Sequence, residues 1–260
     1  MTQHLFHVGS AAGPRGLSAL ATGHLTAHTP KGIWVPRLGQ LWNTRDMSDL
    51  LLPTPQVVAA YEGVRARVIE LLRTTPEADG DRTVPHCPSW TVRELAAHLV
   101  GLPEDVLAGR MEGVTTDAWT QAQVERHRGE TLAQLADAFE ASIEAFAAIL
   151  PHIPVPVNSQ MVMDAVTHEH DLRLALGRSG ARDSDAVSVA VGWLLDMAEN
   201  RSNGLGHQLQ SSGLSPFDLL RVMSGRRSPS QVAALGLDAD ALVALLAGTP
   251  LKPPPQPIDE

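Results

Sequence analysis

The hydrophobic positions of this chain recur at steps of three and four residues over most of its length, which is the pattern of α-helices. Residues 161–177 show it well, because their apolar side chains fall on one face and a glycine follows the last turn. The same spacing predicts further helices at residues 56–72, 91–102, 132–150, 186–198, 215–225, 228–235 and 238–247. Residues 103–129 are expected to form a loop and the first turns of the helix that follows.

Capping and breaking residues support this division of the chain. Thr91 and Glu94 have the spacing of a capping box, and Ser228 and Gln231 repeat it near the end of the chain. Residues 75–85 form a polar loop, and three prolines after residue 150 end the preceding helix. No stretch alternates between apolar and polar residues over a useful length, so we expect an all-α protein.

Residues 1–46 differ from the rest in composition. They are rich in Gly, Pro and Thr, have no sustained period and contain four of the eleven histidines. Four basic residues and one acidic residue give this segment a net charge of +3. Because the whole chain has a net charge of −9, residues 47–260 have a net charge of −12. We expect a poorly ordered extension here, with the folded protein beginning near Met47.

Charge and cysteine content narrow the function classes. A net charge of −9 argues against a general role on nucleic acid or on an anionic membrane surface. Cys87 is the one cysteine, so neither a disulfide framework nor a Cys-rich zinc site is possible within the chain. No apolar run approaches the roughly 18 residues of a membrane span, and residues 1–30 lack a secretory signal pattern. These features suit a cytoplasmic protein.

One pair of residues suggests metal chemistry. Asp164 and His168 are four residues apart, so their side chains share a helix face and could close on one divalent ion. Asp171, three residues further, could orient the imidazole. Glu169 and His170 face elsewhere and read as exposed polar residues. By spacing alone, a structural ion pair is the commoner explanation of such a pair, and His98 reads as a histidine at the edge of an apolar face.

Two motifs change this balance. CPSWTVRELAAHL and, far downstream, HEHDLRLALG resemble the N-terminal metal-binding domain of the mycothiol-dependent maleylpyruvate isomerase family, which belongs to the DinB-like four-helix bundles. The resemblance runs over residues 56–203, and PFDLLRVMSGRRSPSQVAAL resembles a C-terminal segment common in actinobacterial members. It implies a DinB-like bundle at residues 47–203. From spacing and composition we expect short helices packed on it at 204–248 and a mobile proline-rich tail at 249–260.

The resemblance also implies a set of metal ligands. In the family, the histidine that ends the first motif binds a divalent metal together with an acidic residue and a histidine of the second, which here are His98, Asp164 and His168. The family usually has Glu where this chain has Asp164, so the metal is expected closer to the helix or more loosely held. Two imidazoles and one carboxylate leave open positions, as in catalytic zinc sites. Zinc is the expected metal, although a ferrous or nickel ion would accept the same ligands.

The implied activity uses an external thiol. Family members bind the thiol of mycothiol at the metal, so the resemblance implies a monomeric or homodimeric isomerase or S-transferase acting on a small electrophilic substrate. Arg173, Arg226 or Arg227 could anchor carboxylates of the thiol or substrate. Cys87 is not expected to be the nucleophile, because it lacks any recognisable protease or transferase signature.

Two other interpretations remain at this stage. The first is a non-catalytic metal-binding bundle, a sensor or adaptor whose His98, Asp164 and His168 site is degenerate. The second, a zinc-stabilised anti-sigma module, is weaker because such modules resemble a His-x-x-x-Cys-x-x-Cys pattern and Cys87 stands alone.

Overall fold

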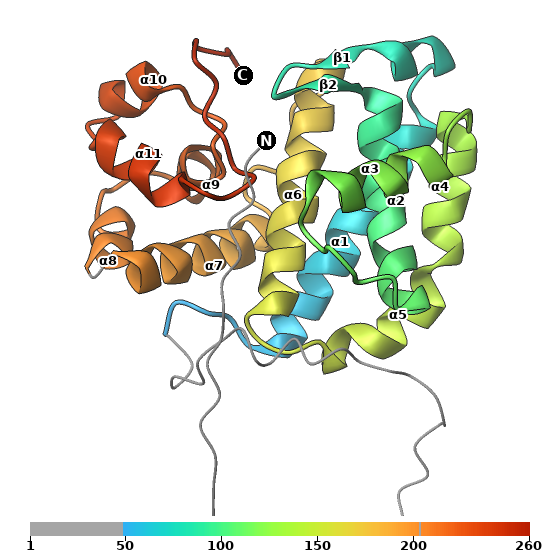
Figure 1. Cartoon of the computed structure of the whole chain (residues 1–260), viewed down its shortest axis with the longest axis horizontal. Helices are drawn as coiled ribbons and strands as arrows, with labels where there is room; N and C mark the ends of the chain where they lie inside the picture. Colours follow the sequence, from blue (N-terminus) through green and yellow to red (C-terminus); the bar gives the residue numbers. More distant parts are fainter. Residues whose placement is uncertain (1–48, 203) are drawn as a thin grey trace, which may run out of the picture. The chain divides into compact units, whose positions relative to one another are not determined.

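A computed structural model describes residues 49–202 and 204–260 of the chain, and helices dominate it (Figure 1). The expected fold class, an all-α bundle with additional C-terminal helices, is confirmed. The N-terminal extension expected at residues 1–46 lies outside the described residues. The helices that form the bundle are α1 (Thr54–Arg73), α2 (Val92–Ala108), α4 (Leu132–Ala141), α5 (Ile143–Ile149) and α6 (Val157–Leu176).

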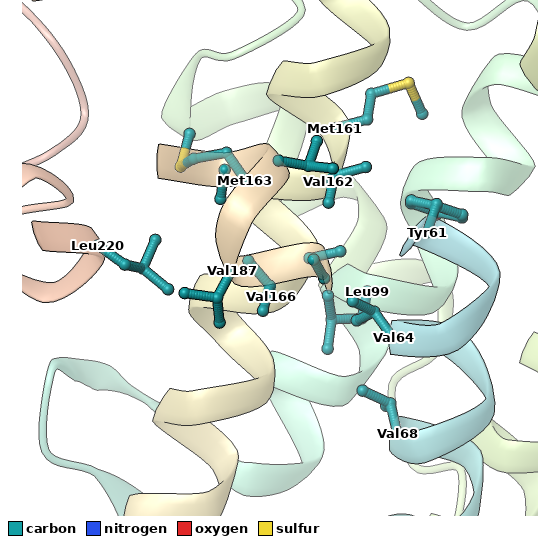
Figure 2. Close-up of a cluster of buried hydrophobic side chains, with 14 of the residues drawn as sticks. Tyr61, Val64, Val68, Leu99, Met161, Val162, Met163, Val166, Val187 and Leu220 are labelled. Carbon is teal, nitrogen blue, oxygen red and sulfur yellow. The ribbon is translucent and has the colours of Figure 1, made fainter. Parts of the chain in front are cut away.

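The bundle closes because α1 and α2 each pack against both α4 and α6. Figure 2 shows part of the shared core, to which α1 contributes Val64 and Val68 and α6 contributes Val162 and Val166. All four valines are at most 1% exposed. Burying one such side chain contributes about 1.5–3 kcal/mol relative to leaving it in water, so this seam fixes how α6 lies in the bundle.

The boundaries of α6 follow from its flanking residues. A proline, Pro156, precedes its first residue, and Gly177 ends it in the left-handed conformation at φ 64°. The Gly177 N–H bonds to the carbonyl of Leu174, and the next N–H bonds to that of Arg173, as in a Schellman-type end. The helix predicted at residues 161–177 is therefore present and begins one turn earlier.

The prediction of a single helix at residues 132–150 is wrong, because the structure divides this segment into α4 and α5 at Ser142. Its hydroxyl donates to the carbonyl of Phe139 at 2.8 Å, a local side-chain bond that competes with the helical pattern. The apolar face continues across the break, since Phe139, Phe146 and Leu150 are all at most 1% exposed. The 3-10 turn η3 (Leu150–His152) then completes the element.

Two other segments differ from expectation. The helix expected to stop at residue 102 continues through Pro103 to Ala108, and Gly109 ends it in the left-handed conformation. Its capping box at Thr91 and Glu94 is present as predicted. The segment before it contains the 3-10 turn η2 (Glu77–Asp81) and a short antiparallel pair of strands, β1 (Thr83–Val84) and β2 (Cys87–Thr91), where no strand was expected. Helix α3 (Asp117–Arg126) lies within the segment expected to be mainly loop.

The C-terminal helices pack onto α6 and α1 through α7, which also contacts α8 and α9. The second predicted capping box, Ser228 with Gln231, is present. Among the described residues, no helix combines the length and apolar character needed to cross a membrane. These helices are α7 (Asp185–Arg201), α8 (Leu205–Gln210), α9 (Pro216–Met223), α10 (Pro229–Ala234) and α11 (Ala239–Leu246).

Candidate metal centre

Three side chains from two helices converge between α2 and α6. His98 comes from α2 and Asp164 and His168 from α6, and one ligand atom of each lies within 4.8 Å of the others. Asp164 Oδ2 is 3.3 Å from His98 Nε2, and Asp164 Oδ1 is 3.6 Å from His168 Nε2. The structure therefore brings His98 next to Asp164 and His168, which lie 66 and 70 positions further along the sequence.

The His98 ring is held from behind by a buried relay. Its Nδ1 lies 2.7 Å from Oε1 of Gln123, and Gln123 Nε2 donates to Oδ2 of Asp105 at 2.8 Å. The other oxygen of Asp105 accepts from Arg110 and Arg126. Because an amide oxygen can only accept, Nδ1 of His98 must carry the proton in this bond. In the neutral ring, Nε2 then presents its lone pair on the side of Asp164.

The His168 ring has an equivalent support. Its Nδ1 lies 3.1 Å from Asp171 Oδ2, and Asp171 is fully buried. Arg221 donates to Asp171 Oδ1 at 2.9 Å, and Arg226 donates to Oδ2 at 2.7 Å. Burial raises the pKa of Asp171, but these two guanidinium groups outweigh it and hold the pKa well below its usual range. The charged carboxylate thus keeps the proton of His168 on Nδ1 and turns Nε2 toward Asp164.

Asp164 is negatively charged in this setting. Burial raises its pKa, but the imidazoles of His98 and His168 outweigh burial and lower the pKa to about 2. Its Oδ2 is buried and has no hydrogen-bond partner among the described residues, since the 3.3 Å contact with His98 is not directed as a hydrogen bond. A buried carboxylate oxygen without a donor is costly, and a cation between the three groups would satisfy it.

The two imidazoles respond differently to this charge. Burial lowers the pKa of His98, but the charge of Asp164, the hydrogen bond to Gln123 and the charge of Asp105 together outweigh it, and the net shift is upward. For His168, burial prevails over Asp164 and Asp171, and the pKa is lowered. A proton on His98 Nε2 therefore competes with a cation for the same position beside Asp164.

Trp90 forms a wall of this cluster. Its ring centroid lies 5.5 Å from that of His98 and 6.4 Å from that of His168. Trp90 precedes the cap residue of α2, where its simplest role was to pack onto that helix, but its ring instead lies against the imidazoles of both helices. An indole here limits water access to the ligand atoms on that side.

Cys87, His168 and Asp171 form a second group with metal-ligand spacing. It is poorly suited to a cation, because Arg221 and Arg226 already occupy both oxygens of Asp171. The Cys87 thiol is also protonated, since burial raises its pKa to about 12 and the charge of Asp171 adds to that effect. We therefore take His98, Asp164 and His168 as the candidate centre.

Several residues lie differently from the sequence-based expectation. Glu169 and His170 were expected to be exposed, but they are 0% and 5% exposed. Glu169 accepts a bidentate pair of bonds from Arg67 and a further bond from Arg173, while the His170 ring packs edge-on against Phe217 at 4.8 Å. The expected surface position of these two residues is therefore wrong.

The three arginines considered as carboxylate anchors all have partners within the protein. Arg173 bonds to Glu169, Arg226 to Asp171 and Arg227 to Glu260. Spacing gave no signal for Gln123 or Arg221, which support the two histidines from other helices. Asp105, which holds Gln123, lies on α2 itself and was also not singled out.

A helical bundle whose facing helices carry two histidines and a buried carboxylate belongs to the class of DinB-like helical domains with a candidate metal centre. Within that class, the family model described as the mycothiol maleylpyruvate isomerase N-terminal domain matches residues 61–173, so this part of the chain is similar to that domain. The match includes all three candidate ligands. Comparisons with curated proteins and with solved structures found no significant match.

Proposed function

We propose that the protein binds a divalent metal, zinc in the first instance, through His98, Asp164 and His168, and uses it in a reaction between a small thiol and an electrophile. The observation that carries this is the arrangement of the donor set: two Nε2 atoms and a charged carboxylate converge, and one oxygen of that carboxylate has no hydrogen-bond donor within the described part of the chain. The residues present thus fit a divalent cation with positions left open for a further ligand.

The family suggests which thiol. The matched domain is named for mycothiol-dependent isomerisation, so we propose mycothiol as the thiol and an isomerase or S-transferase as the activity. When bound, the metal would lower the pKa of a coordinated thiol and make it a thiolate at neutral pH. Such use of a reduced thiol accords with the cytoplasmic location that we propose from the single cysteine.

The chain's own residues contribute support rather than the nucleophile. Gln123 and Asp171 accept the Nδ1 protons of the two histidines and so hold both rings in one orientation. Trp90 excludes water from one side of the cluster. Cys87 is the one cysteine in the chain, and its raised pKa keeps it a thiol, so thiol chemistry at this centre requires an external thiol.

The test begins with metal content, measured by elemental analysis of protein purified without a histidine tag. His168→Ala and Asp164→Ala are expected to lose most bound metal, and Asp164→Glu to retain it. His207→Ala, which removes an exposed histidine on α8, serves as the matched control. Unchanged metal content in His168→Ala would exclude this site.

A second measurement addresses the activity. The metal-loaded protein is incubated with mycothiol and a panel of small electrophiles, and thiol consumption is followed with and without chelator. Chelator-sensitive consumption that His168→Ala abolishes would support the proposal. Bound metal with no thiol consumption would instead favour the non-catalytic metal-binding bundle.

A further inference from the structure

The side chain of Glu260 is held by an unusually complete set of donors. Arg221 donates from Nε at 2.8 Å and also from Nη2, Arg227 approaches at 2.9 Å, and His86 Nε2 lies 2.9 Å away. Arg221 is fully buried and the Glu260 side chain is 5% exposed. Two guanidinium groups and an imidazole around one carboxylate make a carboxylate-binding site, which at present takes a carboxylate of the chain itself.

The charges around this site favour an anion strongly. Within the part of the chain that the structure describes, Arg221, Arg226 and Arg227 form ion pairs with Asp171 and Glu260, and these five groups have a summed charge of +1. Without the Glu260 side chain the net charge would be +2, and a buried guanidinium would lose its main external partner. Any departure of Glu260 therefore favours the entry of another carboxylate.

A cavity adjoins the Glu260 side chain. It has a volume of about 230 Å³ and is lined by Glu260 together with His170, Arg173, Arg182 and Phe217. His170 is 5% exposed, and its Nε2 is buried with no hydrogen-bond partner among the described residues. The Arg182 guanidinium lies 4.7 Å from the Phe217 ring centroid. The cavity is thus lined by a guanidinium group stacked on an aromatic ring and by a buried nitrogen that lacks a partner among the described residues.

The segment that carries Glu260 has few main-chain attachments. Among the described residues, no backbone–backbone hydrogen bond involves residues 252–260, of which four are prolines without an N–H. Apart from Glu260, its attachment by side-chain hydrogen bonds is one bond from Gln231 Nε2 to the carbonyl of Ile258 at 3.0 Å. At the start of the segment, the backbone of Lys252 lies so close to Gly225 that an added Cβ there would come within 3.0 Å of the Lys252 nitrogen.

We propose that these groups form a binding site for a small organic carboxylate, whose carboxylate replaces the Glu260 side chain on Arg221 and Arg227 and whose body occupies the adjoining cavity. The cavity is separate from the candidate metal centre, since none of His98, Asp164 and His168 lines it, and the two sites are linked through Arg221, which also bonds to Asp171. The side chain of Glu260 acts as an internal competitor, so it lowers the apparent affinity for the external carboxylate.

The test uses succinate as the probe and uncharged succinamide as its control, with binding measured by calorimetry on the full chain. Glu260→Ala is expected to bind succinate at least ten-fold more tightly than the unmodified protein, because the internal competitor is gone. Asp259→Ala removes the same charge from the neighbouring exposed residue and should leave the affinity unchanged. Adding Arg227→Met to Glu260→Ala should weaken succinate binding about ten-fold.

Equal succinate affinity in Glu260→Ala and the unmodified protein, or equal binding of succinate and succinamide, would overturn the proposal and leave Glu260 as a structural anchor. If Glu260→Ala fails to fold by circular dichroism, hydrogen exchange of the unmodified protein decides instead. Excess succinate should then accelerate amide exchange in residues 252–260, and unchanged exchange would overturn the proposal. Metal content measured on the same samples keeps this result separate from the proposed metal function.

Discussion

His98 Nδ1 and Gln123 Oε1 lie 2.7 Å apart in the interior, and this contact links a candidate metal ligand on α2 to a fully buried amide on α3. The amide has one orientation available, because its nitrogen is committed to Asp105. The position of His98 Nε2 is thus fixed by a residue that does not approach the cluster itself. Groups that orient metal-binding imidazoles in this way commonly change metal affinity by 10–100-fold when removed.

Gln123→Leu should therefore lower metal affinity by about 10–100-fold while leaving the stoichiometry at saturating metal unchanged. The reason is that leucine keeps the volume but removes the acceptor that holds His98 in orientation. The measurement is a competition titration against a chromophoric chelator. Gln121→Leu, on the exposed face of the same helix, is the control. Equal affinities for the two variants would show that the relay has no positioning role.

A substitution at Gly101 should also lower metal affinity, because Gly101 packs against Gln123. A Cβ at this position would lie 2.5 Å from Cβ of Gln123, so Gly101→Ala must displace α3 and pull Gln123 away from His98. We expect a loss of about 1–3 kcal/mol in the free energy of unfolding from overpacking. We also expect metal affinity to fall at least ten-fold, as for Gln123→Leu.

Gly63→Ala is the matched control for that substitution. It also adds a methyl group within a helix of the bundle, but the nearest atom is Nη1 of Arg67 at 3.2 Å, which is not one of the two nitrogens that bond to Glu169. The gain in helix propensity of up to about 1 kcal/mol should offset that contact. Urea denaturation and the same chelator titration compare the two variants, and normal metal affinity in Gly101→Ala would contradict the prediction.

Local pattern was sufficient for most helices and for the ligand-bearing faces, because caps and apolar spacing are properties of neighbouring residues. The capping boxes at Thr91 and Ser228 and the helix end at Gly177 are examples. The motif resemblance added His98, which spacing alone placed at the edge of an apolar face. The structure then showed it to be 4% exposed and directed at Asp164.

Long-range partners could not be obtained in the same way. Gln123 is 25 residues from His98 and Arg221 is 50 residues from Asp171, and no periodicity relates residues on different helices. The burial of Glu169 had the same origin, because its partner Arg67 lies 102 residues earlier. The break at Ser142 was missed for a different reason, since the apolar face of the predicted helix continues across it.

The Arg67–Glu169 pair should be important for stability. Glu169 is fully buried, and Arg67 donates two bonds to it at 2.8 and 2.7 Å. Arg67→Met should lower the free energy of unfolding by about 3 kcal/mol, because it leaves a buried carboxylate with Arg173 alone. Arg73→Met, which breaks pairs with the exposed Asp137 and Glu140, should cost less than about 1 kcal/mol. Equal losses in urea denaturation would show that burial of the pair has no special effect.

The charge of Glu260 should make stability depend on pH in a defined range. Burial raises its pKa, but the hydrogen bond from His86 and the charges of Arg221 and Arg227 outweigh burial and lower the pKa from 4.5 to about 2. A carboxyl whose pKa is lower in the folded state stabilises the fold above its unfolded pKa. That contribution is lost as the pH falls toward the folded value.

Comparison with Glu260→Gln isolates this contribution, because the other carboxylates titrate in both proteins and cancel in the difference. The difference in unfolding free energy between the two should be constant above about pH 5 and shrink progressively between pH 4.5 and about 2. Urea denaturation at a series of pH values from 7 down to 3 measures it. A difference that is as large at pH 3 as at pH 7 would mean that the bonds to Glu260 do not depend on its charge.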